Sequence, residues 1–264
     1  PPLKTFRGET HEFAFSAGQT AALDALARAS SATPFALVTA LVQALLYRLT
    51  GQDDLVLGTL VAGRDRPELQ DTVGFFVNTL ALRQKLDPAG SFRQLLADTR
   101  STCLQAIADQ HCLFETLVES LGVPRDLSHN PLFDIMVVWQ SNDLAPPRLP
   151  GLTTRSAPLV YPFAKLDLTF HFGRRDGQIL CQIEHSTELF ETASIARLFA
   201  RLETLAAAVL ADPDHVLGTL PVLPAAERTR VVEQFNATAL ALETRRTVMR
   251  PFLDRLAAAP SAPA

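Results

Sequence analysis

The chain has 264 residues, of which 47% are hydrophobic and 20% are charged, so it can bury the core of one large domain or two small ones. Its formal net charge of -4, with Lys and Arg residues scattered along the sequence, excludes a strongly basic nucleic-acid-binding protein. No apolar run reaches the about 18–20 residues that a membrane span needs. We therefore expect neither nucleic acid nor membrane as a partner.

The cysteines and the first residues indicate the setting of the chain. Cys103, Cys112 and Cys181 show no CxxC spacing and cannot all pair, which favours a reducing, cytoplasmic compartment and argues against a zinc site. His111 and Glu115 lie four residues apart, but two ligands do not make a metal site. We expect none in this chain. The opening PPLKTFRG is not a signal peptide and starts without Met, so we expect a fragment of a longer polypeptide.

Strands and helices are predicted in turn along the first half. Residues 11–15 alternate as in a short strand, and Ser16 is a suitable N-cap for the helix after it. A second helix starts at Thr33, with a proline in its first turn, and ends at Gly51. The apolar run at residues 55–61 predicts a strand buried on both faces. A charged loop and another strand follow, and then two amphipathic helices, at about residues 92–107 and 114–121.

The second half predicts three more strands and a long helix. Residues 132–139 predict an apolar strand, and a long loop is expected over 141–164. Residues 166–183 alternate on both sides of an Asp-Gly turn, which predicts a hairpin. A final long helix precedes an extended segment at 211–224 and a short helix, and no element is predicted from Asn236 onwards. This mixture predicts an α/β sandwich on a mixed sheet covered by helices.

Motifs for common chemistries are absent from the sequence. It contains no GxSxG, GxxxxGK[ST], GxGxxG or HExxH. Ser128 and His129 would point apart on a strand, so a turn or capping role is the better interpretation of Ser128. Cys112 has no neighbouring base in the sequence, so we interpret it as a structural thiol rather than a nucleophile.

The best candidate for a functional loop follows the first apolar strand. Arg64 comes after Gly63 in a loop dense with charge, and its planar guanidinium suits both carboxylates and phosphates. The residues alone leave structural ion pairing and ligand contact as equal alternatives. Asp167 and His171 share one face of the hairpin strand, where exposure to solvent is the simpler interpretation.

Three phrases of the sequence resemble the condensation domain of non-ribosomal peptide synthetases. TGQDDLVLGTLVAGRDRPELQDTVGFFVNTLALR, at residues 50–83, is similar to that family's core phrase. RDLSHNPLFDIMVVWQ, at residues 125–140, is similar to its RDxSxxPLF motif and the strand after it. The hairpin and HSTELF, at residues 165–190, resemble the segment before its last helix.

The resemblance implies a fold, an activity and partners. The family has two lobes of a chloramphenicol-acetyltransferase-like fold, and its catalytic HHxxxDG motif lies in the first lobe. This sequence has no His-His pair, so we expect the second, acceptor-side lobe alone, without a catalytic residue of its own. Implied partners are the N-terminal lobe, donor and acceptor peptidyl carrier proteins, and an adenylation domain. The implied substrates are thioesters on the 4'-phosphopantetheine arms of the carriers, with no cofactor bound directly.

Site residues are implied position by position. Arg64 matches an Arg that holds the Asp of the catalytic motif, and Asn78 lies in the FVNTL phrase near the substrate tunnel. Asp167 and His171 could border that tunnel. The RDxSxxPLF motif, which we expect to be structural, supplies the four positions Arg125, Ser128, Pro131 and Phe133.

Domain boundaries and one departure also follow from the resemblance. We expect an inter-lobe linker at 1–9, the lobe at 10–210, a linker to the adenylation domain at 211–235 and the start of that domain at 236–264. Where the family has HQDxPFE, this chain has DQHCLFE at residues 109–115, with His and Asp exchanged.

Two further functions stay open at this stage. The chain could be a docking module for a carrier protein or synthetase subunit, without catalysis. It could also belong to a related transferase, such as an epimerising or starter condensation domain, although the RDLSHNPLF match favours the ordinary subtype.

Overall fold

The computed structural model describes residues 3–124, 126, 128–140, 149–154, 161–239, 247 and 249–261. The chain divides into two compact units, Pro1–Leu223 and Pro224–Ala264, and each is described by itself. The predicted loop at 141–164 lies largely outside the described residues.

A six-stranded mixed sheet forms the centre of the first unit. Its order is β1-β6-β5-β4-β2-β3. The β4 strand pairs in parallel with both β5 and β2, and the remaining pairs are antiparallel. The strands are β1 (Gly8–Ala14), β2 (Asp54–Val61), β3 (Asn78–Lys85), β4 (Ile135–Trp139), β5 (Leu168–Arg175) and β6 (Gln178–Ser186).

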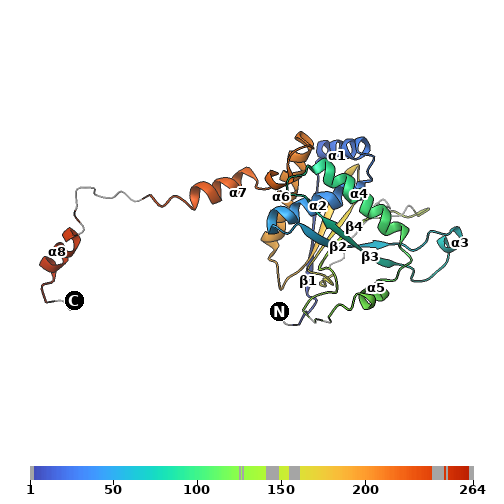
Figure 1. Cartoon of the computed structure of the whole chain (residues 1–264), viewed down its shortest axis with the longest axis horizontal. Coiled ribbons are helices and arrows are strands. Elements are labelled where there is room, and N and C mark those ends of the chain that lie inside the picture. Colours follow the sequence, from blue (N-terminus) through green and yellow to red (C-terminus); the bar gives the residue numbers. More distant parts are fainter. Residues whose placement is uncertain are drawn as a thin grey trace. The chain divides into compact units, whose positions relative to one another are not determined.

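Four long helices pack together beside the sheet, which confirms the predicted mixed sheet covered by helices (Figure 1). They are α1 (Ala17–Ala29), α2 (Pro34–Thr50), α4 (Phe92–Ala108) and α6 (Thr192–Ala211). Two short helices lie closer to the β3 edge, α3 (Pro67–Gln70) and α5 (Phe114–Ser120).

The helix ends follow from the predicted caps. The Ser16 hydroxyl accepts the Gln19 backbone N–H, and the Gln19 side chain accepts the Ser16 N–H, which completes a capping box. Thr33 caps α2, which ends at Gly51 in the left-handed conformation with φ of 74°. These contacts satisfy backbone groups that a helix end leaves without partners.

The core lies between the helices and the face of the sheet that carries Phe170 and Phe172. Both rings are buried, as are Val137 on β4 and Leu57 on β2. Burial of each such side chain contributes about 1.5–3 kcal/mol. The alternation of β5 therefore places its even-numbered residues in the core and Thr169 and His171 on the opposite face.

Gly58 and Phe133 meet on that opposite face. A Cβ at Gly58 would overlap the Phe133 ring, which is only 7% exposed and packs on Phe114 at 5.5 Å between ring centroids. The glycine therefore lets Phe133 lie directly on the backbone of β2. This contact explains why the RDxSxxPLF motif ends in a large aromatic residue.

Three predictions differ from the structure, in the start of one strand, the burial of another and the conformation of a connecting segment. The strand predicted at 132–139 begins at Ile135, because Leu132 has a positive φ of 71° that interrupts extended backbone. The strand predicted at 55–61 is not buried on both faces: Leu60 is 42% exposed, because the long helices cover the Leu57 side. The segment predicted to be extended at 211–224 contains the η1 turn (Leu217–Thr219) and packs Leu217, Leu220 and Val222 into the core.

The second unit contains the predicted short helix and one that the sequence analysis missed. Here α7 (Ala225–Thr229) continues into the π-helical turn η2 (Arg230–Gln234). The missed helix is α8 (Met249–Ala258), in which Met249, Phe252, Leu253 and Leu256 are exposed. The prediction of no element after Asn236 was therefore wrong, because Leu and Ala at helical spacing outweigh the nearby prolines.

No single described helix is long and apolar enough to cross a membrane, and α1 and α2 together reach that length and hydropathy only as a pair bent by 105°.

Substitution of Gly58 tests the packing of Phe133. We expect Gly58→Ala to lower the free energy of unfolding by about 1–3 kcal/mol, because the new methyl group must displace the ring. Denaturant unfolding measures the change. Gly18→Ala in α1 is the matched control, since a Cβ there meets nothing within 4 Å. Equal effects of the two substitutions, or an undiminished effect of Gly58→Ala in a Phe133→Ala background, would contradict this packing.

Candidate functional site

Arg64 organises the β2–β3 loop, which we define as residues 62–77. Its guanidinium donates hydrogen bonds to the backbone carbonyls of Leu69, Thr72 (2.7 Å) and Gly74 (3.1 Å), and a longer one to Gln70 (3.5 Å). The same group lies over the Phe76 ring at 4.6 Å from its centroid. The five donors of arginine, fixed in one plane, can bridge several carbonyls of a loop that forms no strand pairs of its own.

For Arg64 the sequence indicated a carboxylate or phosphate partner, and the resemblance implied the Asp of a motif that this chain does not contain. Within the described residues no carboxylate lies at ion-pairing distance from Arg64 itself, and the carboxylate of this loop that does pair is that of Asp65, with His111. Instead, the backbone of its own loop supplies the acceptors. The local sequence did not indicate this, because backbone acceptors are present at every residue.

Gly63 is required for this geometry. Its φ is +63°, and a Cβ at this position would overlap the Phe76 carbonyl oxygen. A residue with a side chain would therefore have to move the far end of the loop. The Gly-Arg pair thus combines a close backbone approach with the side chain that holds the loop closed.

Asn78 joins the start of β3 to residues 110–114. Its side-chain amide donates to the carbonyls of Gln110 and Cys112, both at 2.8 Å. Its Oδ1 accepts the backbone N–H of Thr79 at 2.9 Å and that of Phe114 at 3.4 Å. Asn78 is buried, and all of these bonds satisfy groups in a connection between two elements.

A second contact joins the β2–β3 loop to the same segment. His111 Nε2 lies 3.3 Å from a carboxylate oxygen of Asp65. The His that has exchanged places with Asp in DQHCLFE is therefore the residue that reaches the loop. The sequence analysis did not predict this pair, because the two residues are far apart along the chain.

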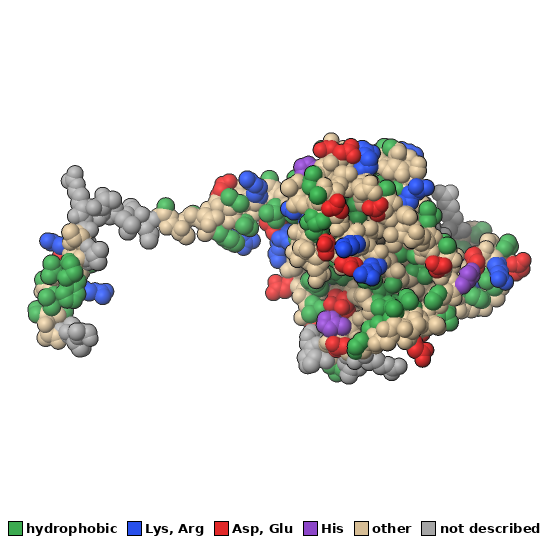
Figure 2. All heavy atoms as spheres, viewed as in Figure 1, with side chains coloured by type: hydrophobic (Ala, Val, Ile, Leu, Met, Phe, Trp, Pro, Cys, Tyr) green, Lys and Arg blue, Asp and Glu red, His purple; other side chains and the backbone are tan. Residues whose placement is uncertain are grey.

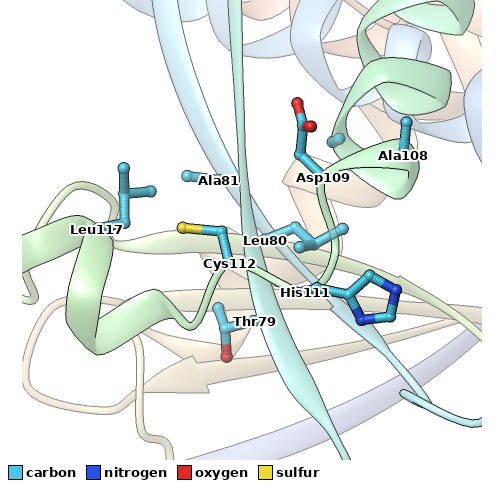
Figure 3. Close-up of a pocket in the computed structure, with 9 residues that line it drawn as sticks. Thr79, Leu80, Ala81, Ala108, Asp109, His111, Cys112 and Leu117 are labelled. Atoms are coloured by element: carbon cyan, nitrogen blue, oxygen red, sulfur yellow. The ribbon is translucent and has the colours of Figure 1, made fainter.

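A cavity of about 550 Å³ lies beside this junction. Its lining includes Thr79, Ala81, Asp109, His111, Cys112 and Leu117. Figure 3 shows the Cys112 sulfur directed toward Leu117 and the His111 imidazole directed the other way. The two side chains therefore do not form the thiol–imidazole pair that activates a cysteine nucleophile.

A polar cluster forms where β4 and β5 begin. Lys4 Nζ bridges Asp134 (3.0 Å) and Asp167 (2.8 Å), and His129 Nδ1 lies 3.1 Å from Asp134. Burial alone would raise the pKa of Asp134, but hydrogen bonds from the Asn130 backbone, Lys4 and His129 hold it below its usual value. Lys4, assigned from the sequence to a linker, is thus part of the folded unit.

The structure places the predicted tunnel residues apart from Arg64. Asp167 belongs to the Lys4 cluster, and His171 lies on β5 opposite Val138 and Gln182. His171 is half-buried rather than exposed, and burial lowers its pKa. Its neighbour Glu184 has a raised pKa, also because of burial. In the sheet order, β4 separates β5 from the strand that leads into Arg64.

The described motif residues have the structural contacts expected of them. Ser128 donates its backbone N–H and its hydroxyl to Asp126, both at 2.7 Å, which confirms the turn interpretation. The Pro131 carbonyl accepts the Phe133 N–H at 3.0 Å, so the motif turns before β4. Arg125 lies outside the described residues.

Charges of both signs are mixed on the face shown in Figure 2, where Lys and Arg side chains alternate with Asp and Glu side chains. No basic patch gathers on that face.

The sequence model described as "Condensation domain" matches residues 1–232 of this chain. The chain belongs to the condensation domain family. Phosphinothricin tripeptide synthetase PhsC of Streptomyces viridochromogenes is 42% identical over 238 residues, which are 90% of this chain and 22% of that protein. Tyrocidine synthase 2 of Brevibacillus parabrevis is 34% identical over 254 residues, which are 96% of this chain and 7% of that protein. The chain thus spans only a small part of the length of these relatives.

Solved structures agree with the family and the fold. A four-domain nonribosomal peptide synthetase bound to AMP and glycine matches with a TM-score of 0.80 and 27% identity, over 85% of this chain and 18% of that chain. The X-domain from teicoplanin biosynthesis matches with a TM-score of 0.76 and 26% identity, over 84% of this chain and 51% of that chain. The condensation domain described here therefore has the chloramphenicol-acetyltransferase-like architecture of its family.

Substitution of Asn78 tests the junction of this condensation domain. We expect Asn78→Ala to lower the free energy of unfolding by about 1–3 kcal/mol, because buried carbonyls and amides lose their partners. Hydrogen exchange of the Thr79 and Phe114 amides should become faster, since both donate to the Asn78 oxygen. Both effects can be measured by denaturant unfolding and by amide exchange with NMR detection.

Asn78→Asp separates the two halves of this contact. It keeps an acceptor for the Thr79 and Phe114 amides but places a carboxylate against the Gln110 and Cys112 carbonyls. We expect it to be destabilised as well. Asn236→Ala, in the second unit, is the control for loss of an asparagine. Unchanged exchange in Asn78→Ala would show that the junction does not depend on Asn78.

Proposed function

We propose that this chain is the acceptor-side, C-terminal lobe of a condensation domain that forms peptide bonds in a non-ribosomal peptide synthetase. The observation that carries the proposal is the extent of the structural match. The lobe covers 51% of the teicoplanin X-domain chain, and 48% of the chain in the structure of the first condensation domain of the CDA synthetase. One of two similar lobes would give this proportion.

The reaction would join two substrates held as thioesters on phosphopantetheine arms. The amine of the acceptor attacks the donor carbonyl, the C–N bond forms, the C–S bond breaks, and the thiol leaves with a proton. A general base must accept the proton lost by the amine. No His-His pair occurs in this sequence, so the proposal assigns that step to an HHxxxDG motif on the N-terminal lobe.

This lobe would contribute to the reaction by holding the surfaces that align the two substrates. The two substrates react only when their ends are held close together and aligned, and a displacement of about 1 Å can lower the rate by about 100-fold. Arg64 fixes the β2–β3 loop, and Asn78 and the Asp65–His111 pair connect that loop to the cavity beside β3. We therefore assign Arg64 and Asn78 a positioning role. Asp167 and His171 are proposed to border the substrate tunnel.

The proposed partners follow the same division. Donor and acceptor carrier proteins would deliver the substrates, and the N-terminal lobe would cover the inner surface of this one. Residues 1–9 would be the inter-lobe linker, which packs on this lobe through Lys4 and enters β1 at Gly8. Residues 10–210 would be the lobe, and 211–235 the connection to an adenylation domain that begins at 236–264, with the first part of that connection packed into the core. The family match, which ends at residue 232, supports the last boundary.

Reconstitution with the missing lobe tests this function. We expect the chain, mixed with a lobe that carries HHxxxDG and with donor-loaded and acceptor-loaded carrier proteins, to yield a dipeptidyl thioester. Mass spectrometry of the acceptor carrier detects that product. Arg64→Ala and Arg64→Lys should lower the rate about 10- to 100-fold, because the loop loses its bridging donors.

Arg197→Ala is the matched control, since Arg197 is exposed on α6 and bonds to Ser194 at 2.8 Å. Its rate should equal that of the unchanged chain. The assignment of Arg64 fails if Arg64→Ala turns over normally. The peptide-forming function fails if the two lobes associate without any dipeptidyl thioester, and α-proton exchange on a carrier-bound residue would then favour an epimerising relative.

A further inference from the structure

A second polar cluster lies at the β1 edge of the sheet, which is the edge away from β3. It is on the face of β1 and β6 that packs against α6. His185 on β6 is paired in the sheet with Glu9 on β1, and His11 lies two residues further along β1 on the same face. Side chains that pair directly across antiparallel strands, and their diagonal neighbours, lie within reach of one another. The sheet thus brings two imidazoles and one carboxylate together.

His185 is the unusual member of this cluster. It is 0% exposed, and neither of its ring nitrogens has a partner at good hydrogen-bond geometry, although the backbones of Glu9 and Ile183 lie close enough for weak contacts. Buried polar atoms are nearly always well satisfied, so this imidazole has a nitrogen available to bind a ligand from outside the chain. Burial and the neighbouring His11 lower the pKa of His185, whereas the charge of Glu9 and the weak backbone contacts raise it.

The distances fit a chelated metal ion. His11 Nε2 lies 3.3 Å from Glu9 Oε2, which is about the separation of two ligands in a tetrahedral zinc site with bonds of about 2.0–2.1 Å. The rings of His11 and His185 lie 5.4 Å apart between centroids, and one donor atom from each of the three residues falls within 4.8 Å of the other two. Rotation of the side chains that shortens the longer separations to about 3.3 Å would bring all three donor atoms to bonding distance.

The surroundings support the same interpretation. The Thr192 hydroxyl, at the start of α6, donates to Glu9 Oε2 at 3.1 Å and so orients the carboxylate. Glu9 is exposed and His11 is half-buried, which leaves a path from solvent to the buried imidazole. The cluster therefore combines an entry route, an oriented carboxylate and a buried ligand without a partner.

A second group of similar composition gives a useful contrast. His129, Asp134 and Asp167 also lie close together, but Lys4 Nζ bonds to both carboxylates and already supplies the positive charge. No cation is bonded in this way to the His185 group within the described residues. The two groups thus differ in whether the chain itself provides the counter-charge.

We propose that Glu9, His11 and His185 form a Zn²⁺ site that fastens the edge strand β1 to β6. Imidazole and carboxylate ligands suit zinc better than Mg²⁺ or Ca²⁺, which prefer all-oxygen sites. Three protein ligands leave a fourth position for water. The proposal departs from the expectation of no metal site, which rested on cysteine spacing and on residues close together in sequence.

Zinc titration of the full chain, prepared without a histidine tag and freed of metal by a chelator, tests the site. We expect isothermal titration calorimetry to show one Zn²⁺ per chain, and Co²⁺ to give the strong visible absorption of a tetrahedral site. Glu9→Gln and His11→Gln should each weaken binding by at least about tenfold, since loss of even an outer-shell partner costs about 10- to 100-fold. His185→Phe should abolish it.

Two control variants locate the binding. His129→Gln removes the histidine of the Lys4 cluster, and Cys112→Ser removes the exposed thiol. Neither should change the affinity. The proposal is overturned if no stoichiometric zinc binds, if Glu9→Gln and His11→Gln bind normally, or if Cys112→Ser removes the binding. Should His185→Phe fail to fold, the two partly exposed ligands decide the question.

Discussion

The guanidinium of Arg64 gives the β2–β3 loop an internal scaffold. Residues 62–77 join two antiparallel strands, yet the loop itself forms no strand pairs, and its regular structure is limited to the single helical turn of α3. Its carbonyls would otherwise depend on water. Arg64 collects several of them around one charged group and packs that group on Phe76. Hydrogen bonds from a charged donor contribute about 1.5–3 kcal/mol, which is more than neutral ones do.

Other contacts extend this order to the neighbouring segment. Asp65 pairs with His111 at 3.3 Å, and Asn78 bonds to three backbone groups of residues 110–114. The loop, the start of β3 and the cavity lining thus form one connected structure. A change at Arg64 should therefore be felt at the cavity through backbone position, without direct contact.

The sequence predicted the elements well where local chemistry decides them. Ser16, Thr33 and Gly51 marked helix ends correctly, and the Asp176–Gly177 turn predicted the hairpin, because caps and turns depend on neighbours in sequence. Contacts between distant residues could not be predicted in this way. Lys4 gave no sign that it would bridge Asp134 and Asp167, which meet only when β4 and β5 pair.

The candidate site shows the same limit. The sequence singled out Arg64 and Asn78, but it did not indicate that the Arg64 guanidinium bonds to backbone carbonyls of its own loop. The grouping of Glu9, His11 and His185 depends on the register of β1 against β6, and residues so far apart give no spacing to recognise. Composition can identify residues with suitable chemistry, but the fold decides which of them meet.

Arg64 orders the β2–β3 loop, and the positions of the neighbouring segments depend on that order. Backbone ¹⁵N relaxation by NMR, compared between the unchanged chain and Arg64→Lys, measures it residue by residue. A lysine keeps the charge but cannot bridge several carbonyls with one planar group. We expect order parameters to fall selectively over residues 65–77, while those of β2 and β3 stay high. Unchanged order in the loop of Arg64→Lys would contradict the account.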